Sequence, residues 1–173
     1  MMPIRWALQI LTQQKKAIEC AVQALEPERL NRRGGESTWS VLEIVDHLRK
    51  VEEGFADGMA ASGNLSVNVR RTESVRAFLL VGFMLLPTKV KIPAGAPVHP
   101  DAELDVTRVV SSWNETRSGL LRTISQLQNG KVSGGVIRHP VSGWMGLTAA
   151  TWFLAAHMIH HRYQLRRVLK SEM

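Results

Sequence analysis

Apolar residues recur at helical spacing in four long windows of the chain. In the first window, Ile4, Leu8 and Leu11 follow one another at steps of four and three, and the stripe continues toward Leu25. The windows cover about residues 4–25, 41–61, 105–127 and 149–169. A repeat near 3.6 residues is typical of amphipathic α-helices. The pattern therefore predicts four long helices.

Local signals mark where two of these helices begin. Ser40 and Glu43 have the spacing of a capping box at the start of the second window. Thr148 precedes the fourth window and is a candidate N-cap residue. The third window is closed by the turn-forming stretch "NGKVSGG". These signals predict the helix ends independently of the apolar periodicity.

A long connection, residues 63–104, separates the second and third windows. Within it, "SVRAFLLVGFMLLP" predicts a shorter helix that stops near Pro87, and "IPAGAPVHPD" is too rich in proline and glycine to be regular. We find no alternating pattern that predicts a β-hairpin. The predicted fold class is all-α: a four-helix bundle with one long crossover connection, formed by residues 1–173 as a single domain.

Charge and composition narrow the function classes. The chain has 22 Lys and Arg against 15 Asp and Glu, which gives a net charge of +7. The basic residues are spread along the chain, so we expect neither a nucleic-acid nor a membrane partner. The longest apolar run, residues 77–87, is shorter than the roughly 20 residues that span a bilayer. A single cysteine, Cys20, excludes an internal disulfide and is expected to be packed in a helix; together with the absence of a signal-peptide pattern it predicts a cytoplasmic protein.

Half of the six histidines lie within "AAHMIHHRY", residues 155–163. His157 and His161 are four residues apart, so on a helix they point to the same side, one turn apart. This spacing presents two imidazoles to one metal ion. His160 points about 100° away from His161 and need not share that site. Gln164 continues the face of the pair and can bond near a metal or a substrate.

His47, in "VLEIVDHLRKVEE", is the best third ligand. Ile44, Leu48 and Val51 lie on adjoining turns, so His47 should face the interior. A buried neutral imidazole needs partners for its ring nitrogens, and a metal would supply one. Packed rings that bond to carbonyl groups are the alternative interpretation of all three histidines. Spacing alone leaves both interpretations open.

Two stretches resemble the DinB/YfiT-like superfamily. "STWSVLEIVDHL" (37–48) is similar to the start of that family's second helix, where a Trp-Ser pair precedes a His-Leu dipeptide. "HPVSGWMGLTAATWFLAAHMIHHRYQL" (139–165) is similar to its ending, with His-Pro, a glycine turn, Leu-Thr and then His-x3-His followed by Gln. The stretch "FLLVGFMLLPTKVKIPAGAPVHP" matches no part of the family pattern.

The resemblance implies an up-down-down-up four-helix bundle, commonly dimeric. It also implies a divalent metal ion, often nickel or zinc, held by three histidines, which correspond by position to His47, His157 and His161. Activities in the family include thiol-dependent isomerisation and transfer of low-molecular-weight thiols, and many members are described as metal-dependent hydrolases. Despite the family's name, the resemblance implies no DNA binding.

Our leading hypothesis is a metal-dependent enzyme, a hydrolase or a thiol transferase with a low-molecular-weight thiol as co-substrate. Its three-histidine site would keep one coordination position open. Gln164, His160 and Glu43 are candidates for contacting the substrate or supporting the ligands; Glu43 is also explained by its cap, and His160 by packing. The rival is a non-catalytic homodimeric interaction or stress-response module with a structural or vestigial metal site. The surplus apolar segment, residues 78–86, would form the dimer interface in either case. A third interpretation, an anion or membrane-surface binder, rests on the +7 charge.

Overall fold

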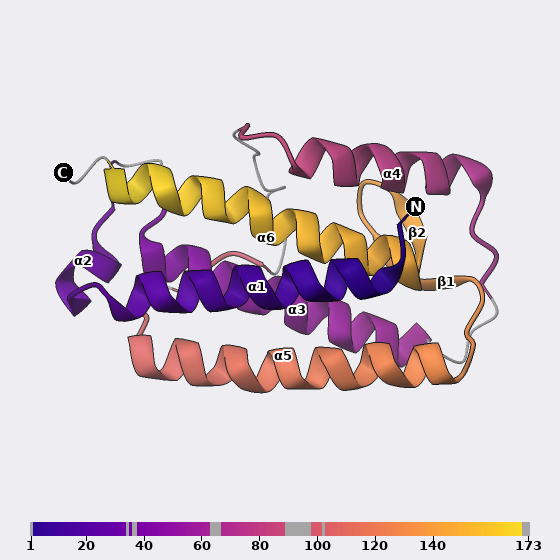
Figure 1. Ribbon diagram of the computed structural model, residues 1–173, viewed down its shortest axis with the longest axis horizontal. Helices are drawn as coiled ribbons and strands as arrows, with labels where there is room; N and C mark the ends of the chain where they lie inside the picture. Colours follow the sequence, from indigo (N-terminus) through magenta and orange to yellow (C-terminus); the bar gives the residue numbers. More distant parts are fainter. Residues whose placement is uncertain are drawn as a thin grey trace.

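Four long helices lie side by side in the computed structural model, as the periodic windows predict (Figure 1). They are α1 (Ile4–Gln23), α3 (Val41–Ser62), α5 (Val106–Asn129) and α6 (Leu147–Lys170). The structure describes residues 2–33, 35, 38–62, 67–88, 98–101 and 103–170. In Figure 1, α1 and α6 run in one direction and α3 and α5 in the other. The predicted all-α, up-down-down-up bundle is therefore confirmed.

Two further helices join this bundle. α2 (Pro27–Asn31) lies just beyond the first periodic window, where the sequence pattern predicted no helix. Its proline stands at the first helical position, where its fixed φ angle suits a helix and its missing N–H is not needed. α4 (Arg71–Met84) is the predicted helix of the long connection and packs against α6. Within the described residues, no helix is both long and apolar enough to cross a membrane.

The prediction that the chain lacks a β-hairpin is wrong. β1 (Gly135–His139) and β2 (Gly143–Gly146) pair antiparallel, with an irregular register between Gly135 and Ile137. Strands of four and five residues are too short to show an alternating pattern, and the irregularity interrupts it further. Gly143 has a φ of 81°, and a Cβ atom there would lie 2.4 Å from the Glu73 carboxylate. Glu73 also accepts the Trp144 N–H at 3.0 Å, which attaches the hairpin to α4.

Hydrogen bonds at the helix starts support one predicted cap and correct the other. The Glu43 carboxylate accepts the Ser40 N–H at 2.8 Å, and the Ser40 hydroxyl accepts the Glu43 N–H at 3.2 Å. This reciprocal pair is the predicted capping box. α6, however, begins at Leu147, so Gly146 precedes the helix and Thr148 lies inside its first turn. The expected N-cap role of Thr148 is therefore wrong.

A buried ion pair links three helices in the bundle interior. Arg117 of α5 donates to the Glu52 carboxylate of α3, with its Nε at 2.8 Å, and to the Leu11 carbonyl of α1 at 3.1 Å. Because breaking such a pair would leave an uncompensated buried charge, it fixes the mutual position of three helices. Cys20, expected to be packed, is exposed on α1, so that prediction is wrong.

Candidate metal centre

α3 and α6 bring three imidazoles together in the bundle interior. His47 lies in the second turn of α3, and His157 and His161 lie one turn apart on α6. At most 8% of any of the three side chains is exposed. The Nε2 atom of His157 is 3.3 Å from that of His47 and 3.0 Å from that of His161. The three histidines selected from the sequence thus lie close enough to bind one metal ion.

Outer hydrogen bonds set which ring nitrogens carry protons. His47 donates from Nδ1 to the Val98 carbonyl oxygen at 2.7 Å. His161 donates from Nδ1 to the Gln164 side-chain oxygen at 2.8 Å. A neutral imidazole has one N–H, so Nε2 of each ring is left with an unprotonated lone pair. Both lone pairs are directed at His157.

Burial keeps these rings neutral at pH 7. It lowers the pKa of His47 to about 4, although the bond to Val98 acts in the opposite direction. The pKa values of His157 and His161 lie well below the usual histidine range, chiefly because of burial and secondly because of the neighbouring imidazoles. A neutral imidazole is the form that binds a metal ion, so no proton must be displaced at neutral pH.

The spacing of the nitrogens suits a shared cation. Two imidazole nitrogens bound to one ion at about 2.1 Å, with about 90–110° between the bonds, lie about 3.0–3.4 Å apart. The observed separations of 3.0 and 3.3 Å fall in this range. A proton on Nε2 of His157 points at one neighbouring lone pair and leaves the other unmatched, whereas a cation is attracted to all three nitrogens. The donor set therefore fits a divalent metal ion.

Aromatic rings enclose the three histidines. The Trp39 ring lies 4.9 Å from His47, centroid to centroid, and is nearly parallel to His161 at 6.5 Å. Phe153 stacks on His157 at 5.6 Å. These contacts restrict the rotation of the imidazoles and exclude water from their flanks. Trp39 was not selected as a site residue, because it lies in a loop where no periodicity tells which way a side chain points.

The other candidate residues have different surroundings. Gln164 contacts the ligand-like His161, as its position on the helix face suggested. Nδ1 of His160 lies 3.2 Å from the Leu86 carbonyl at the end of α4, outside the three-histidine cluster. Glu43 is engaged by Arg33 and by its own cap. The backbone carbonyl of Val98 was missed entirely, because no sequence signal marks which carbonyl a side chain will find.

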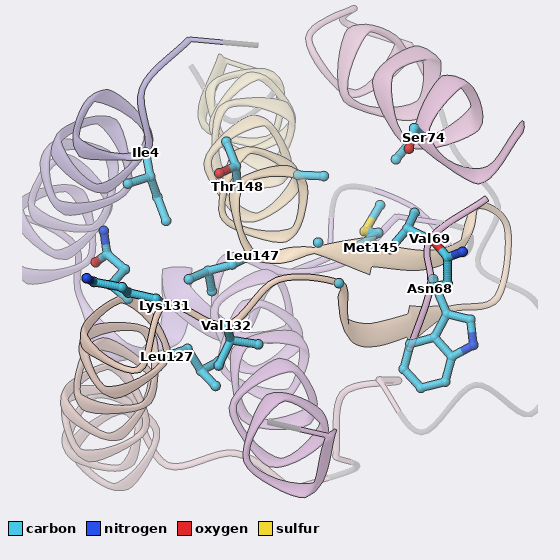
Figure 2. Close-up of a pocket in the computed structure, with 16 residues that line it drawn as sticks. Ile4, Asn68, Val69, Ser74, Leu127, Lys131, Val132, Met145, Leu147 and Thr148 are labelled. Carbon is cyan, nitrogen blue, oxygen red and sulfur yellow. The ribbon is translucent and has the colours of Figure 1, made fainter. Parts of the chain in front are cut away.

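A cavity of about 510 Å³ lies elsewhere, where α1 and α6 begin and α5 ends (Figure 2). Leu147 lines it, ten residues before His157, which is about 15 Å along the helix. Among the described residues that line this cavity, Lys131 is the one ionisable side chain. The lining therefore holds neither a metal-ligand set nor an acid–base pair, and the candidate chemistry belongs to the histidines.

Fold and site together define a four-helix bundle protein with a candidate three-histidine metal centre. The family model described as DinB superfamily matches residues 10–165, and the chain belongs to this superfamily. A search of curated proteins finds no significant match. Among solved structures, the chain is similar to TT2238, described as a four-helix bundle protein, with 17% identity, a TM-score of 0.59 and coverage of 97% of this chain and 99% of that one. At this identity the likeness shows a shared fold.

Proposed function

We propose that this protein is a metal-dependent enzyme whose divalent ion is held by His47, His157 and His161. The observation that carries the proposal is the convergence of their Nε2 atoms within 3.0 and 3.3 Å of the central one, while outer acceptors hold the Nδ1 protons of His47 and His161. Imidazole donors favour zinc or nickel over magnesium or calcium. Three protein ligands are typical of catalytic sites, which keep a position for water or substrate.

The bound ion would lower the pKa of a water or thiol, so that a nucleophile forms at neutral pH. The chain's own residues supply the rest. Val98 and Gln164 hold the imidazole protons, so the lone pairs stay directed at one point. Trp39 and Phe153 keep the rings in place. This set suits a hydrolase or a transferase that uses a low-molecular-weight thiol, which are the reaction types the family resemblance implies.

Metal analysis of protein purified without a polyhistidine tag tests this proposal, because a tag would itself carry nickel or zinc. We expect about one equivalent of zinc or nickel per chain, either as purified or after loading of chelator-treated protein. Loaded protein should then turn over activated ester or amide substrates, or transfer a small thiol to an electrophile, and chelator-treated protein should not. If the protein neither contains nor takes up a metal ion, the proposal of a metal-dependent enzyme is refuted.

A second candidate, a homodimeric interaction module, is favoured by the outer face of α4. Phe78, Leu79 and Phe83 are exposed by 64%, 62% and 44%, and Leu86, two residues beyond the end of the helix, by 50%. Apolar side chains this close together on one helix face are typical of a protein contact. A second copy is the simplest partner, because most soluble oligomers are two-fold symmetric.

Light scattering at micromolar concentrations separates the two candidates when it is combined with the metal analysis. A dimer without metal binding or turnover would favour the interaction module. A metal-loaded monomer would favour the enzyme and would count against self-association. The two properties are compatible, because α4 contacts the metal-site helix through its inner face and leaves its outer face free.

A further inference from the structure

A short segment at the end of the crossover connection lies along α3 beside His47. We call residues 98–101 the strap. Its Val98 carbonyl accepts the His47 Nδ1 proton at 2.7 Å. Its Asp101 N–H donates to the Asp46 carboxylate at 3.1 Å. Lys50 donates to the His99 carbonyl at 2.8 Å and to the Asp101 carboxylate at 2.6 Å.

Asp46 is buried, with 1% of its surface exposed. Burial of a carboxylate is costly unless charges and donors surround it. Here Arg49 lies 2.9 Å from it and Lys50 3.5 Å, and the strap supplies the third partner through its amide. Asp46 and Lys50 are four residues apart and share a face of α3 that flanks the direction of His47. One face of α3 thus holds the strap through Asp46 and Lys50, and His47 donates its Nδ1 proton to the strap.

The two outer acceptors of the histidine cluster differ in how they are placed. Gln164 stands three residues after His161 on the same helix, so the helix itself fixes their distance. Val98 lies 51 residues after His47 and outside any helix or strand. The Val98 side chain packs against the apolar core and the His99 ring lies edge-on to Trp39, whereas the backbone groups of the strap are held by side chains of α3. Asp46 and Lys50 make those contacts.

We propose that Asp46 and Lys50 are positioning residues for the metal ligand His47. They hold the strap, the strap holds the Nδ1 proton of His47, and the Nε2 lone pair therefore stays directed at His157. This inference rests on the proposed function. It assigns a role to the end of the crossover connection, whose Val98 carbonyl orients the His47 ring on α3.

Metal affinity of the full chain is the first test, measured by competition with a chromophoric chelator. Lys50→Met and Asp46→Asn should weaken zinc binding by about tenfold or more, the range found when outer-shell partners of metal ligands are lost. Asp101→Ala should act in the same direction, and Asp101→Asn should restore most of the affinity, because it keeps an oxygen for Lys50. Asp101 is largely exposed, so this pair leaves folding intact. Glu53→Gln is the matched control: Glu53 binds Arg49 and does not touch the strap.

Two spectroscopic readouts separate positioning from general destabilisation. In cobalt-loaded protein, the visible absorption bands should shift in Lys50→Met and Asp101→Ala and match wild type in Glu53→Gln. In metal-free protein, imidazole nitrogen NMR should show His47 protonated at Nδ1 in wild type and as a mixture of tautomers in Lys50→Met. Unchanged cobalt bands, affinity and tautomer in these variants would overturn the positioning role while the metal site stands. A wild-type chain that binds no metal would refute the proposed function, and an unaltered tautomer in Lys50→Met would then refute the strap's hold on His47 as well.

Discussion

The last helix of the bundle, α6, packs against α4 of the crossover connection, and the two helices differ in what they bury. α6 places His157, His160 and His161 inside the molecule, each at most 8% exposed. α4 leaves Phe78 and Leu79 more than 60% exposed. Buried polar groups and exposed apolar patches are the two informative departures from an ordinary distribution. Here both occur on neighbouring helices.

The difference teaches that the two faces need different partners. Each buried imidazole nitrogen has lost water and requires a hydrogen bond or a metal ion in its place. The apolar side chains on the outer face of α4 are still in contact with water. Their burial against another surface would be favourable. A small ion would satisfy the first face, and contact with another apolar surface would bury the second. Changes in one face should leave the partner of the other unaffected.

The largest expected effect is the loss of metal-linked stability in His161→Ala. At a metal concentration 1,000 times the Kd, binding should raise the free energy of unfolding of the wild-type protein by about 4 kcal/mol. His161→Ala keeps two of the three proposed ligands, so metal should raise its free energy of unfolding very little. His160→Ala is the matched control, since His160 bonds to Leu86 outside the cluster. Thermal unfolding with and without zinc measures both.

The opposite result for the two variants would contradict the assignment of His157 and His161, from their helical spacing, as the metal ligands on α6. If His160→Ala abolishes the zinc-dependent stabilisation and His161→Ala retains it, the ligands are not the histidines that share a helix face. Self-association should be the same in wild type and His161→Ala, because His161 bonds to Gln164 and His157 and makes no contact with the outer face of α4.

A second effect concerns pH and His139, which packs against Phe153 beyond the cluster. Burial lowers the pKa of His139 to about 4, against 6.5 when it is exposed. The unfolded chain therefore binds this proton first as the pH falls. The stability contributed by neutral His139 is complete above about pH 6.5 and is lost progressively as the pH falls toward 4.

Metal-free His139→Gln should accordingly lose less stability than wild type between pH 7 and pH 4.5. Urea unfolding at several pH values gives the two slopes. Equal slopes would show that His139 is accessible to protons in the folded state. The α4 face provides the contrast: from Val75 to Leu86 it carries Arg76 as its one ionisable residue, so self-association should not follow the titration of histidine.

The sequence predicted those parts of the site that depend on a single helix. The four-residue spacing of His157 and His161, and the three residues from His161 to Gln164, translate directly into shared faces. His47 was oriented by its apolar neighbours Ile44 and Leu48. That α3 brings it to within 3.3 Å of His157 is a tertiary fact, which the family resemblance implied and helical periodicity does not contain.

The remaining features have no periodic signal. The Val98 carbonyl is a backbone group, and every residue has one. The hairpin of residues 135–146 is too short to show alternation, and α6 starts one residue before Thr148 because Gly146 belongs to β2. The surplus of apolar residues at 78–86 was visible in the sequence, whereas the exposure of Phe78 and Phe83 required the packing of α4 on α6.

A third, smaller effect is expected in Phe78→Ser. If two copies of α4 face each other, each Phe78 is partly covered by the other copy, and a two-fold interface loses the buried apolar surface of both rings in this variant. The dimer Kd should rise by at least about tenfold, and monomer stability should change little because Phe78 is already exposed. Leu121→Ser on α5 is the control, another exposed apolar residue on a different helix. Sedimentation equilibrium measures the two Kd values. Equal Kd values for wild type and Phe78→Ser would place the interface elsewhere or remove it.

The smallest expected effect tests whether the centre of the outer face of α4 contacts solvent or a partner helix. Gly82 lies four residues from both Phe78 and Leu86, and a Cβ atom added there would meet nothing within 4 Å. Within a helix, Gly82→Ala should raise the free energy of unfolding of the monomer by about 0.5–1 kcal/mol. Gly54→Ala on α3, equally open, should give the same gain. A partner helix that crosses at Gly82 would meet the new methyl group, so Gly82→Ala, unlike Gly54→Ala, should also weaken the dimer. If the two variants gain equal stability and dimerise like wild type, no helix approaches Gly82 closely, and the contact would lie toward the edge of the face at Phe83.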